Sequence, residues 1–392
     1  MLDYVGTLSG PSIWFWLLAL IGLAWLRRHL QLSRADRDPA LSAADAGDGP
    51  GPLPPLTVLV AAKDEEANIG ACLAGLLAQD YPGLQIVVCN DRSTDRTPSI
   101  IDELASRDPR LKPVHIAELP AGWAGKNHAL HEGMCQVTTE YVCFTDADCR
   151  YHSPKLLAAA MRTVQRQGLD FLSALPQLEA HTFRERVVQP PAGAIMVFWF
   201  PPEKVNDPQS PRAYANGAFM LMSRRAYDTL GGHERVRTAL NEDMHFARRA
   251  KQLGLKLRVL RGGQLYSVRM YVGLRQIWNG WSRIFYGCFG TLPRLVVSAI
   301  FLSVFSVLPY LSMLLSPLAG DAAPGVAGAA AFAAAAQQSV LWRFYRLCQV
   351  PAPWALAYPL GAGLCLGMVL NAMTRHLGTR TRWRGTTYHG GA

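Results

Sequence analysis

The stretch TVLVAAKDEE (Thr57–Glu66) joins an apolar, β-branched run to four charged residues. Two prolines precede the run, and this pattern predicts a buried strand that leads into a helix. A second run of the same kind, Gln85–Asp91, predicts another strand. Between them, Ala67–Gln79 places its apolar side chains at helical spacing and ends before Tyr81-Pro82-Gly83, so a helix is expected there.

The same alternation continues toward the C-terminus. The sequence predicts a helix over Asp95–Ser106, a strand over Pro113–Glu118, a helix over Asn127–Val137 and a strand over Tyr141–Asp146. Alternation of this kind is typical of an α/β fold with a mostly parallel sheet and helices on both faces. Ligands of such sheets bind at the carboxyl ends of the strands.

Composition indicates that part of the chain lies in a membrane. Of 392 residues, 50% are hydrophobic and only 17% are charged. Tyr4–Leu26 carries no charge and is long enough to span a bilayer. Asp3 precedes it and Arg27 and Arg28 follow it, which favours an uncleaved anchor and places the chain after it in the cytoplasm.

Three more uncharged stretches lie near the C-terminus: Leu295–Gly320, Ala322–Trp342 and Leu347–Thr374. If all three span, the basic tail faces outside, against the positive-inside tendency. If the alanine-rich Ala322–Trp342 is re-entrant or interfacial, the tail, with Arg375, Arg380, Arg382 and Arg384, returns to the cytoplasm. Two and three C-terminal spans are both left open.

These features divide the chain into six parts. They are an anchor (1–30), a flexible linker (31–55), a catalytic domain (56–271), an interfacial helix (272–290), transmembrane helices (291–375) and a basic tail (376–392). The interfacial helix is expected because Val272–Tyr286 carries apolar residues on one face, although a helix buried in the soluble core would show the same pattern. Ala192–Phe200 is a second apolar run, just after Pro190-Pro191, that could line a binding cleft.

The charge and the cysteines exclude several classes of protein. The net charge is +10, and Met244–Arg294 holds ten Lys or Arg and no acidic residue, with aromatic residues between them. In a hydrophobic chain this favours an anionic membrane surface over nucleic acid. The eight cysteines include no C-x-x-C pair, so buried, reduced thiols are expected in place of a zinc site or a disulfide scaffold.

Acidic residues follow the predicted strands in a chain that is otherwise poor in them. Glu65 follows the first strand, Asp91 ends the second, and Asp146 and Asp148 end the strand Tyr141–Asp146. Two carboxylates at positions i and i+2 can bind Mg²⁺ or Mn²⁺ when phosphate oxygens and water complete the coordination. Taken singly, each motif could equally be a turn or a helix cap.

Six motifs in this order resemble the family-2 glycosyltransferases of the GT-A fold. They are AAKDEE (Ala61–Glu66), NDRSTDRT (Asn90–Thr97), PAGWAGKNHAL (Pro120–Leu130), FTDAD (Phe144–Asp148), GGH (Gly231–His233) and NED (Asn241–Asp243). The anchor, the WAGKN loop, RMY (Arg269–Tyr271) and WRGxxY (Trp383–Tyr388) are similar to bacterial members linked to carotenoid, hopanoid or other lipid glycosylation.

The resemblance implies roles for particular residues. Asp91 and Glu65 would bind the uracil and ribose, Asp146 would contact the nucleotide sugar, and Asp148 would hold a divalent metal, Mn²⁺ or Mg²⁺, on the diphosphate. Lys126 would lie near the phosphates, where an ammonium group suits anionic oxygens. Trp123 would flank the donor or the acceptor, or it would serve packing alone.

Asp243 occupies the position of the general base in this resemblance. Inversion at the anomeric carbon needs a base that takes the proton of the acceptor hydroxyl. The alternative is that Glu242 and Asp243 form an acidic helix start, which the helix dipole favours. His233 could touch the leaving phosphate or the acceptor, or be a plain loop histidine.

The function expected from the sequence is therefore that of a multi-pass inner-membrane enzyme with a cytoplasmic catalytic domain. It would be an inverting glycosyltransferase that moves a sugar from a nucleotide sugar, a UDP-hexose in this interpretation, to a lipid hydroxyl. A processive polysaccharide synthase is the alternative, although Arg275–Trp281 lacks the Arg before Trp that processive members carry. A non-catalytic membrane scaffold would require damaged acidic positions, and none is missing.

Overall fold

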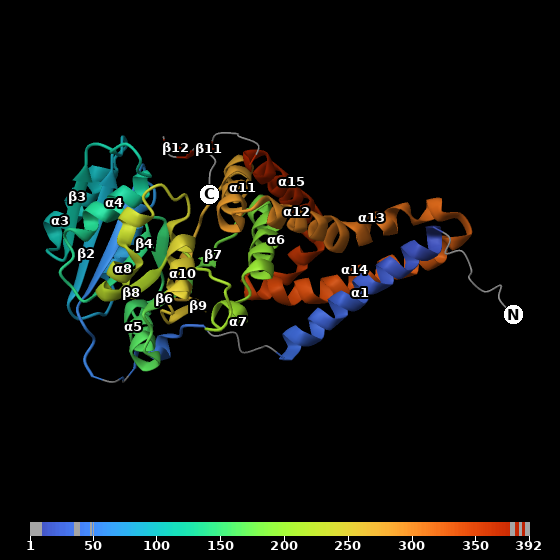
Figure 1. The fold of residues 1–392 in the computed structure, drawn as a ribbon, viewed down its shortest axis with the longest axis horizontal. Helices are drawn as coiled ribbons and strands as arrows, with labels where there is room; N and C mark the ends of the chain where they lie inside the picture. The colour runs from blue at the N-terminus through green and yellow to red at the C-terminus, as the bar shows by residue number, and fades with distance from the viewer. Residues whose placement is uncertain are drawn as a thin grey trace.

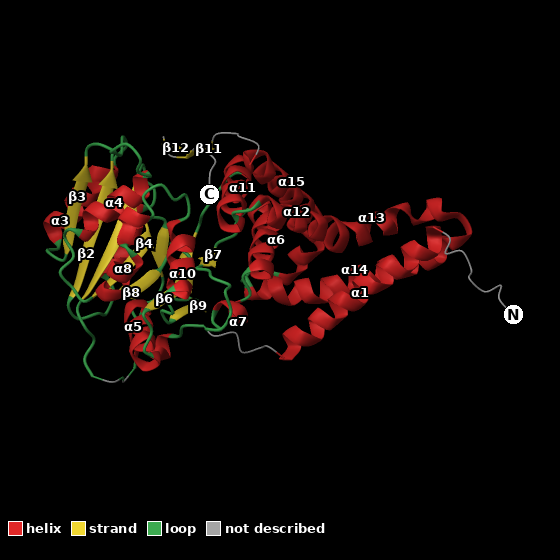
Figure 2. Ribbon diagram, viewed as in Figure 1, coloured by secondary structure: helices red, strands yellow, loops and turns green. Residues whose placement is uncertain are grey.

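The computed structural model describes residues 10–34, 40–47, 49, 51–376, 381–383 and 386–388. A part built on a central β-sheet lies at one end of the molecule and a group of long helices at the other (Figure 1). Figure 2 shows that the strands of the central sheet are confined to the first part.

The central sheet has seven strands in the order β3-β2-β1-β4-β8-β6-β9. Their bounds are β1 (Leu56–Ala62), β2 (Leu84–Asp91), β3 (Leu111–Ile116), β4 (Tyr141–Asp146), β6 (Phe171–Leu175), β8 (Met220–Ser223) and β9 (Leu257–Arg261). Strands β3, β2, β1 and β4 are parallel, β8 runs against both its neighbours, and β6 and β9 again follow the direction of β4. The expected mostly parallel sheet is thus confirmed.

Helices cover both faces of the sheet because successive strand residues point to opposite sides. Val58 and Val60 of β1 pack with α2, α3 and α5, whereas Leu59 packs with the cluster that holds α4, α8 and α10. The bounds are α2 (Ile69–Leu77), α3 (Thr97–Arg107), α4 (Gly125–Met134), α5 (Leu156–Gln167), α8 (Arg224–Leu230), α9 (Gly232–Arg235) and α10 (Glu242–Gln252). The predicted elements therefore lie where the sequence placed them, with ends shifted by a few residues.

Two smaller sheets complete the strands. One has the order β5-β10-β7, with β5 (Cys149–Tyr151), β7 (Gln177–Leu178) and β10 (Tyr266–Val268), and it lies beyond the end of β4. The other pairs β11 (Thr381–Trp383) with β12 (Thr386–Tyr388), so that the first and last residues of the WRGxxY stretch each lie in one of its two strands. Of the tail's arginines, Arg380 and Arg384 lie outside the described residues.

A layer of helices joins the sheet to the long helices. It consists of α6 (Phe183–Trp199), α7 (Pro202–Val205), α11 (Leu274–Phe289) and α15 (Tyr358–His376). The apolar face of α11 is buried: Ile277, Trp281 and Phe285 are at most 3% exposed. Trp281 Nε1 donates to Gln189 Oε1 of α6 at 2.8 Å, and Asn371 Nδ2 of α15 donates to Ser282 Oγ at 3.1 Å. The face expected to lie on the leaflet is therefore packed against protein, because α6 and α15 cover it.

The long helices form a bundle of α1 (Gly10–Arg34), an irregular arm and α14 (Ala323–Leu347). The arm consists of α12 (Leu292–Phe301), a π-helix (Leu302–Val307), α13 (Leu308–Leu315) and a 3₁₀ segment (Ser316–Ala322). The carbonyl group of Phe305, inside the π-helix, accepts hydrogen bonds from Trp25 Nε1 at 3.0 Å and Gln337 Nε2 at 2.8 Å, which ties the arm to both other helices.

Three described stretches are long and apolar enough to cross a membrane: Ser12–Leu30, Leu292–Leu347 and Ala352–Arg375. The second would measure about 84 Å as one straight helix at ~1.5 Å per residue, far more than the ~30 Å of a bilayer core. It folds back at Gly320, whose φ of 58° is not helical, and α13 then packs along α14. The stretch Leu292–Leu347 is therefore long enough to cross a bilayer twice.

The described part of the linker and most of the cysteines pack against other parts of the chain. The described part of the linker contains a 3₁₀ helix (Ala43–Ala46) against α5, and Leu41 N donates to Arg261 O at 2.8 Å. All eight cysteines are free thiols. Six of them are buried, but Cys135 is exposed and Cys348 is half-buried, which corrects the expectation that all are buried.

Candidate active site

The acidic residues expected at the strand ends converge at one edge of the sheet. Asp91 ends β2 and Asp146 ends β4, and β1 lies between these strands. Asp91 is 3% exposed, and its carboxylate accepts from Arg92 Nε at 2.7 Å. Glu65 follows β1, is 6% exposed, and accepts from Asn68 Nδ2 at 2.9 Å. Parallel pairing thus gathers residues that are far apart in the chain.

The WAGKN loop is fixed by contacts to the segment that precedes α10. Ala124 N donates to Arg237 O at 2.6 Å, and Asn127 Nδ2 donates to Val236 O at 2.6 Å and Ala239 O at 3.0 Å. Gly125 lies so close to the Asp91 carboxylate that a Cβ atom would collide with it. A glycine here lets the start of α4 approach the end of β2.

Lys126 lies between two carboxylates. Its Nζ atom is 2.7 Å from Asp146 Oδ1 and 2.7 Å from Glu242 Oε1. Burial opposes the charge of the ammonium group, but the attraction of Asp146 and Glu242 outweighs it and raises the pKa of Lys126. The lysine expected near phosphates is thus a cation held by acidic side chains from β4 and α10.

Asp243 follows Glu242 at the start of α10 and lies next to the ion pairs of Lys126. Its Oδ2 accepts from Gly217 N at 2.9 Å and its Oδ1 from Met244 N at 2.7 Å. Burial and the neighbouring Glu242 carboxylate nevertheless raise the pKa of Asp243 to about 7. A carboxyl group with a pKa near neutrality can accept and release a proton under physiological conditions.

Asp146, Asp148 and Glu65 all lie near the buried thiol of Cys72. This thiol donates to Asp146 O at 3.6 Å, and burial together with the three carboxylates raises its pKa. Among the described residues, no three His, Cys, Asp or Glu side chains converge to form a complete metal site. Asp146 and Asp148 can supply two carboxylates, which suffices for a hard divalent ion that takes its other ligands from phosphate and water.

Trp123 and His233 are placed differently from the acidic residues. The Trp123 ring packs on His131 and His128, with centroid distances of 4.9 and 5.4 Å. His233 is fully buried, and its Nδ1 is 2.9 Å from the Tyr227 hydroxyl. Burial, with the nearby Lys126, lowers the pKa of His233 to about 3. This neutral histidine belongs to the core between Phe144 and Phe246.

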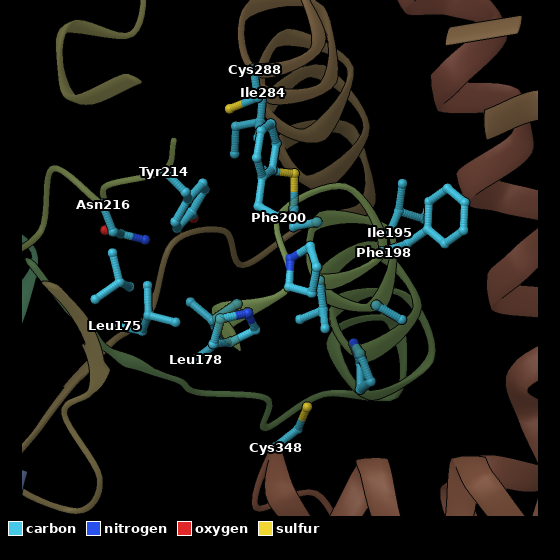
Figure 3. A pocket seen from close by; sticks show the side chains of 18 of the residues that line it. Leu175, Leu178, Ile195, Phe198, Phe200, Tyr214, Asn216, Ile284, Cys288 and Cys348 are labelled. Carbon is cyan, nitrogen blue, oxygen red and sulfur yellow. The ribbon is translucent and has the colours of Figure 1, made fainter. Parts of the chain in front are cut away.

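A cavity of about 1950 Å³ opens beside Asp243. Lys126, Asp146, Glu242 and Asp243 line it at the sheet, and α6, α11 and α14 form its other walls. Figure 3 shows Tyr214 and Asn216 facing Phe200 and Ile284 across it, with Cys348 near α14. Typical small-molecule sites occupy roughly 300–1,000 Å³, so this cavity has room for two substrates.

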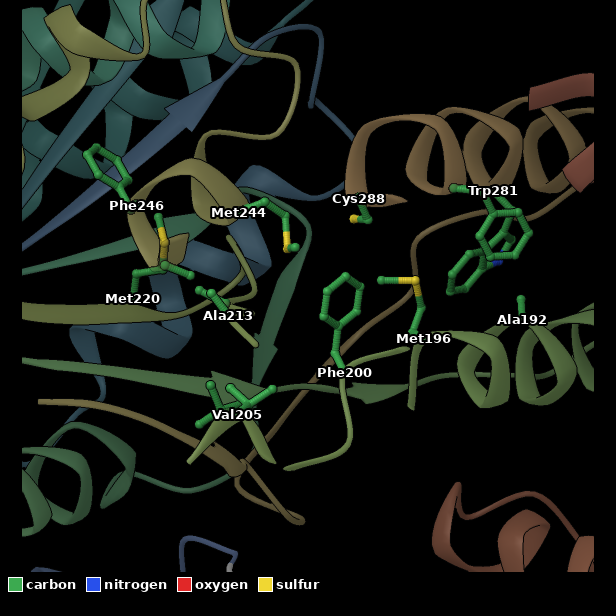
Figure 4. Close-up of a cluster of buried hydrophobic side chains, with 14 of the residues drawn as sticks. Ala192, Met196, Phe200, Val205, Ala213, Met220, Met244, Phe246, Trp281 and Cys288 are labelled. Atoms are coloured by element: carbon green, nitrogen blue, oxygen red, sulfur yellow. The ribbon is translucent and has the colours of Figure 1, made fainter. Parts of the chain in front are cut away.

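A continuous apolar cluster holds α6 and α11 to the sheet. Phe200 and Met196 lie between Met244 on one side and Trp281 on the other, with Cys288 above them (Figure 4). The cavity therefore has one wall in the catalytic domain and one in the helical layer, and their relative position is fixed by packing.

Some lining residues were not identified from the sequence. Gly217 supplies the backbone donor to Asp243, and Asn216 turns the chain there by accepting from Ala218 N at 3.0 Å. The sequence feature that could have identified these two residues is the Ala215-Asn216-Gly217 triplet before β8. Arg258 and Arg261 of β9 and Arg343 and Arg346 of α14 also line the cavity. The sequence shows that these arginines come in pairs, but it does not show that the two pairs line one cavity.

Comparison with known proteins gives a consistent result. Residues 54–268 match the family described as Glycosyltransferase like family 2. The chain is 25% identical over 265 residues to a 4,4'-diaponeurosporenoate glycosyltransferase of Staphylococcus aureus. This alignment covers 67% of this chain and 69% of the relative. The chain is 37% identical over 137 residues to a beta-monoglucosyldiacylglycerol synthase of Synechocystis sp., which covers 34% of this chain and 28% of that one.

A solved structure shares the fold. A mannosyltransferase from Pyrobaculum calidifontis, in complex with GDP-Man and Mn²⁺, superposes with a TM-score of 0.52 at 21% identity and covers 92% of this chain and 99% of its own. The match at the family level spans more than half of the chain and includes every acidic strand end described above. The protein is therefore a glycosyltransferase of family 2 with the GT-A fold.

Proposed function

We propose that this enzyme is an inverting glycosyltransferase that transfers one sugar from a nucleotide sugar, a UDP-hexose in our proposal, to the hydroxyl group of a lipid. The observation that carries the proposal is the shared cavity. Its polar end holds Lys126, Asp146 and Asp243, and its apolar walls continue along α6 and α14. A polar donor and an apolar acceptor can therefore meet beside one carboxyl group.

In this proposal Asp243 is the general base. It takes the proton of the acceptor hydroxyl as that oxygen attacks the anomeric carbon, opposite the leaving diphosphate. The raised pKa of about 7 suits the role, because the carboxylate is then basic enough to bind a proton and is still ionised in part at neutral pH. The backbone N–H groups of Gly217 and Met244 fix its orientation.

Asp91 and Glu65 bind the nucleoside in this proposal, and Asp146 contacts the nucleotide sugar. Asp148 holds Mn²⁺ or Mg²⁺, which would neutralise charge on the diphosphate when bound. Lys126 keeps Asp146 in place before the donor enters and can then turn toward phosphate oxygens. Trp123 is kept as a candidate at the rim of the site. The Mn²⁺ in the Pyrobaculum mannosyltransferase complex supports the use of a divalent metal.

A lipid acceptor is supported by two relatives. Their names specify diaponeurosporenoate and monoglucosyldiacylglycerol, both of which are lipids. The apolar surface of this chain agrees with that environment: Trp16 of α1, Leu314 of α13 and Ile300 of α12 are each more than half exposed. Large exposed apolar surfaces mark membrane or partner contacts.

We further propose that α1, the α12–α13 arm and α14 span the inner membrane. Trp14 Nε1 donates to Ser312 Oγ at 3.2 Å and Trp25 Nε1 to Phe305 O, so α1 and the arm are antiparallel. α14 then returns toward the sheet. α15 packs on α11 and α6, which suggests a helix at the cytoplasmic surface and a cytoplasmic tail. In this arrangement the alanine-rich stretch spans and the last apolar stretch does not.

The test uses the full chain purified in detergent with host lipids. A panel of UDP- and GDP-sugars with Mn²⁺ or Mg²⁺ is assayed for transfer, and mass spectrometry identifies the glycosylated lipid. We expect transfer from one donor, its loss after chelation, and loss by orders of magnitude in Asp148→Asn, because the leaving diphosphate loses charge neutralisation. Transfer that survives exhaustive chelation, or that yields only soluble glycosides, would contradict the proposal.

A further inference from the structure

Three pairs of arginines line the same cavity away from Asp146, Glu242 and Asp243. Two pairs come from candidate membrane helices, Arg27 and Arg28 of α1 and Arg343 and Arg346 of α14, and the third pair comes from the edge strand β9, Arg258 and Arg261. A guanidinium group keeps its charge at every physiological pH and suits the geometry of phosphate oxygens. The cavity therefore has a cationic end that no role proposed above uses.

This end is separate from the nucleotide-sugar site. Asp146 ends β4 and Arg261 ends β9, and these strands have the same direction, with β8 and β6 between them. Three strand spacings of ~4.8 Å place the two strand ends about 14 Å apart. An anion at the arginines is therefore a different group from a diphosphate held beside Asp146 and Asp148.

The three pairs come from elements on both sides of the junction between the catalytic domain and the helical bundle. The positive charge of Arg261 lies close enough to the thiol of Cys348 to favour its deprotonation. Cys348 is the C-cap residue of α14, so Arg261 lies near the end of this helix. Trp25, two residues before Arg27, lines the cavity and is bonded to Phe305 of the arm. A ligand at this end would contact the sheet and both helices at once.

Several of these charges have no acidic partner. Within the described part of the chain, Arg27, Arg28, Arg258 and Arg346 form no ion pair, although Glu203 and Asp207 also line the cavity. The Nε atom of Arg258 is buried and has no hydrogen-bond partner. Arg27 and Arg346 are exposed and Arg28 and Arg258 are half-buried, so these guanidinium groups are open to an anionic ligand in the cavity, which would also give the buried Nε atom of Arg258 a partner.

The rest of the wall indicates what kind of anion fits. Apolar side chains from α6, the π-helix and α14 line the cavity beside the arginines: Phe198, Leu302, Phe305, Leu341 and Phe344. An inorganic ion would leave this surface without a partner. A molecule with an acidic head and apolar chains would cover both parts.

We propose that the arginine end of the cavity binds the phosphate group of an anionic membrane lipid, whose chains lie against α6, the π-helix and α14. The lipid bridges β9 to the two helices and fixes the catalytic domain on the membrane. It occupies a site distinct from that of the donor, so the proposal stands independently of the sugar and the acceptor.

The test measures lipid binding to the full chain by native mass spectrometry in detergent. The probes are phosphatidylglycerol, the zwitterionic phosphatidylcholine with the same chains, and inorganic phosphate. We compare the wild type with Arg258→Gln/Arg261→Gln and Arg343→Gln/Arg346→Gln. The control is Arg107→Gln/Arg225→Gln, which removes two exposed arginines outside the cavity. UDP titration on each preparation reports whether the variant is folded.

We expect the wild type and the control to bind phosphatidylglycerol at least ~10-fold more tightly than phosphatidylcholine, since charge-assisted bonds to phosphate are strong. Each cavity double variant should lose about tenfold in affinity for phosphatidylglycerol while UDP affinity stays unchanged. Should a double variant fail to bind UDP, the single variants Arg258→Gln and Arg346→Gln replace it.

Two results would overturn the proposal. One is a set of folded cavity variants that bind phosphatidylglycerol as tightly as the control. The other is displacement of the lipid by millimolar inorganic phosphate, which would show a site for a free anion. Neither result depends on sugar transfer, so a failure here is separable from a failure of the proposed reaction.

Discussion

At the scale of residues, the active site is controlled by one cation among three carboxyl groups. Lys126 pairs with Asp146 and Glu242 at 2.7 Å each, and its charge also lowers the pKa of Asp243. Burial and Glu242 act in the opposite direction and prevail. The proton affinity of Asp243 is therefore set first by its burial and then by the neighbouring Glu242 carboxylate, against the opposing effects of Lys126 and the backbone N–H groups.

The proposed role of Asp243 as the general base predicts a specific kinetic defect. Asp243→Asn keeps the size of the side chain but cannot accept the proton, so kcat should fall by roughly 10²–10⁴-fold while UDP affinity stays nearly unchanged. Single-turnover transfer and UDP titration on one preparation measure both. Asp228→Asn, on an exposed surface of α8, is the control. An Asp243→Asn enzyme with near wild-type turnover would make Glu242 the candidate to test.

Asp91 should show the reverse pattern. Its proposed contact to the nucleoside exists in the ground state and in the transition state alike, so Asp91→Asn should weaken UDP binding and leave kcat of the saturated enzyme largely intact. The same titration and single-turnover assays measure it. Unchanged UDP affinity in this variant would remove Asp91 from the donor site.

The raised pKa of Asp243 predicts a pH dependence. The base works only when it is deprotonated, so kcat/KM should rise with pH through about 7 and then level off. Removal of the ammonium group in Lys126→Met should move this midpoint to higher pH, because Lys126 lowers the pKa of Asp243. Initial rates across pH 5.5–9 check both. A flat profile, or a midpoint that moves down in the variant, would contradict the assignment.

At the scale of elements, α11 is held on α6 and α15 by close contacts. Gly280 faces the ring of Tyr271, and a Cβ atom there would collide with the ring. On the other side, Gly367 of α15 lies against the Trp278 ring. The glycine at 367 lets α15 approach Trp278 of α11, and the glycine at 280 makes room for the Tyr271 ring of the segment before α11.

Gly280→Ala should therefore destabilise the protein. Overpacking of this kind costs about 1–3 kcal/mol, which exceeds the gain in helix propensity of about 1 kcal/mol. The thermal midpoint in detergent should fall by several degrees. Gly273→Ala is the matched control, because nothing lies within 4 Å of its added Cβ atom and its φ of −119° is open to any residue. Equal midpoints for the two variants would show that Tyr271 moves aside without cost.

At the scale of the whole molecule, the irregular arm and α14 form a hairpin that packs along α1. The far end of the hairpin carries Asp321, which is exposed, and the near end carries the cavity arginines. In the proposed orientation, with the sheet in the cytoplasm, the far end would reach the opposite side of the membrane. The polar cavity then lies at the cytoplasmic surface.

This arrangement predicts which residues react from outside the cell. In a Cys135→Ser background, which removes the exposed native thiol, Asp321→Cys should react with a membrane-impermeant maleimide on intact cells. Glu66→Cys, exposed after β1, should react only after permeabilisation. Gel shifts of the labelled protein give the readout. Reaction of Glu66→Cys in intact cells would overturn the orientation of the catalytic domain.

The sequence by itself was sufficient to predict the secondary-structure elements and the candidate functional residues. Apolar periodicity is a local property, so β1, β2 and β4 and the helices between them were predicted to within a few residues. The positions of Asp91 and Asp146 at strand ends followed from the same pattern. The family resemblance, which the match over residues 54–268 confirms, also rested on short local motifs.

Only the tertiary structure decided which of these residues meet. Lys126 and Glu242 are far apart in the chain, and their ion pair exists because Asn127 binds the carbonyl groups before α10. The apolar face of α11 fits a lipid surface or a protein neighbour equally well by pattern, and α15 covers it only because the chain folds back after α14. Contacts of this kind depend on packing between distant segments, which periodicity does not encode.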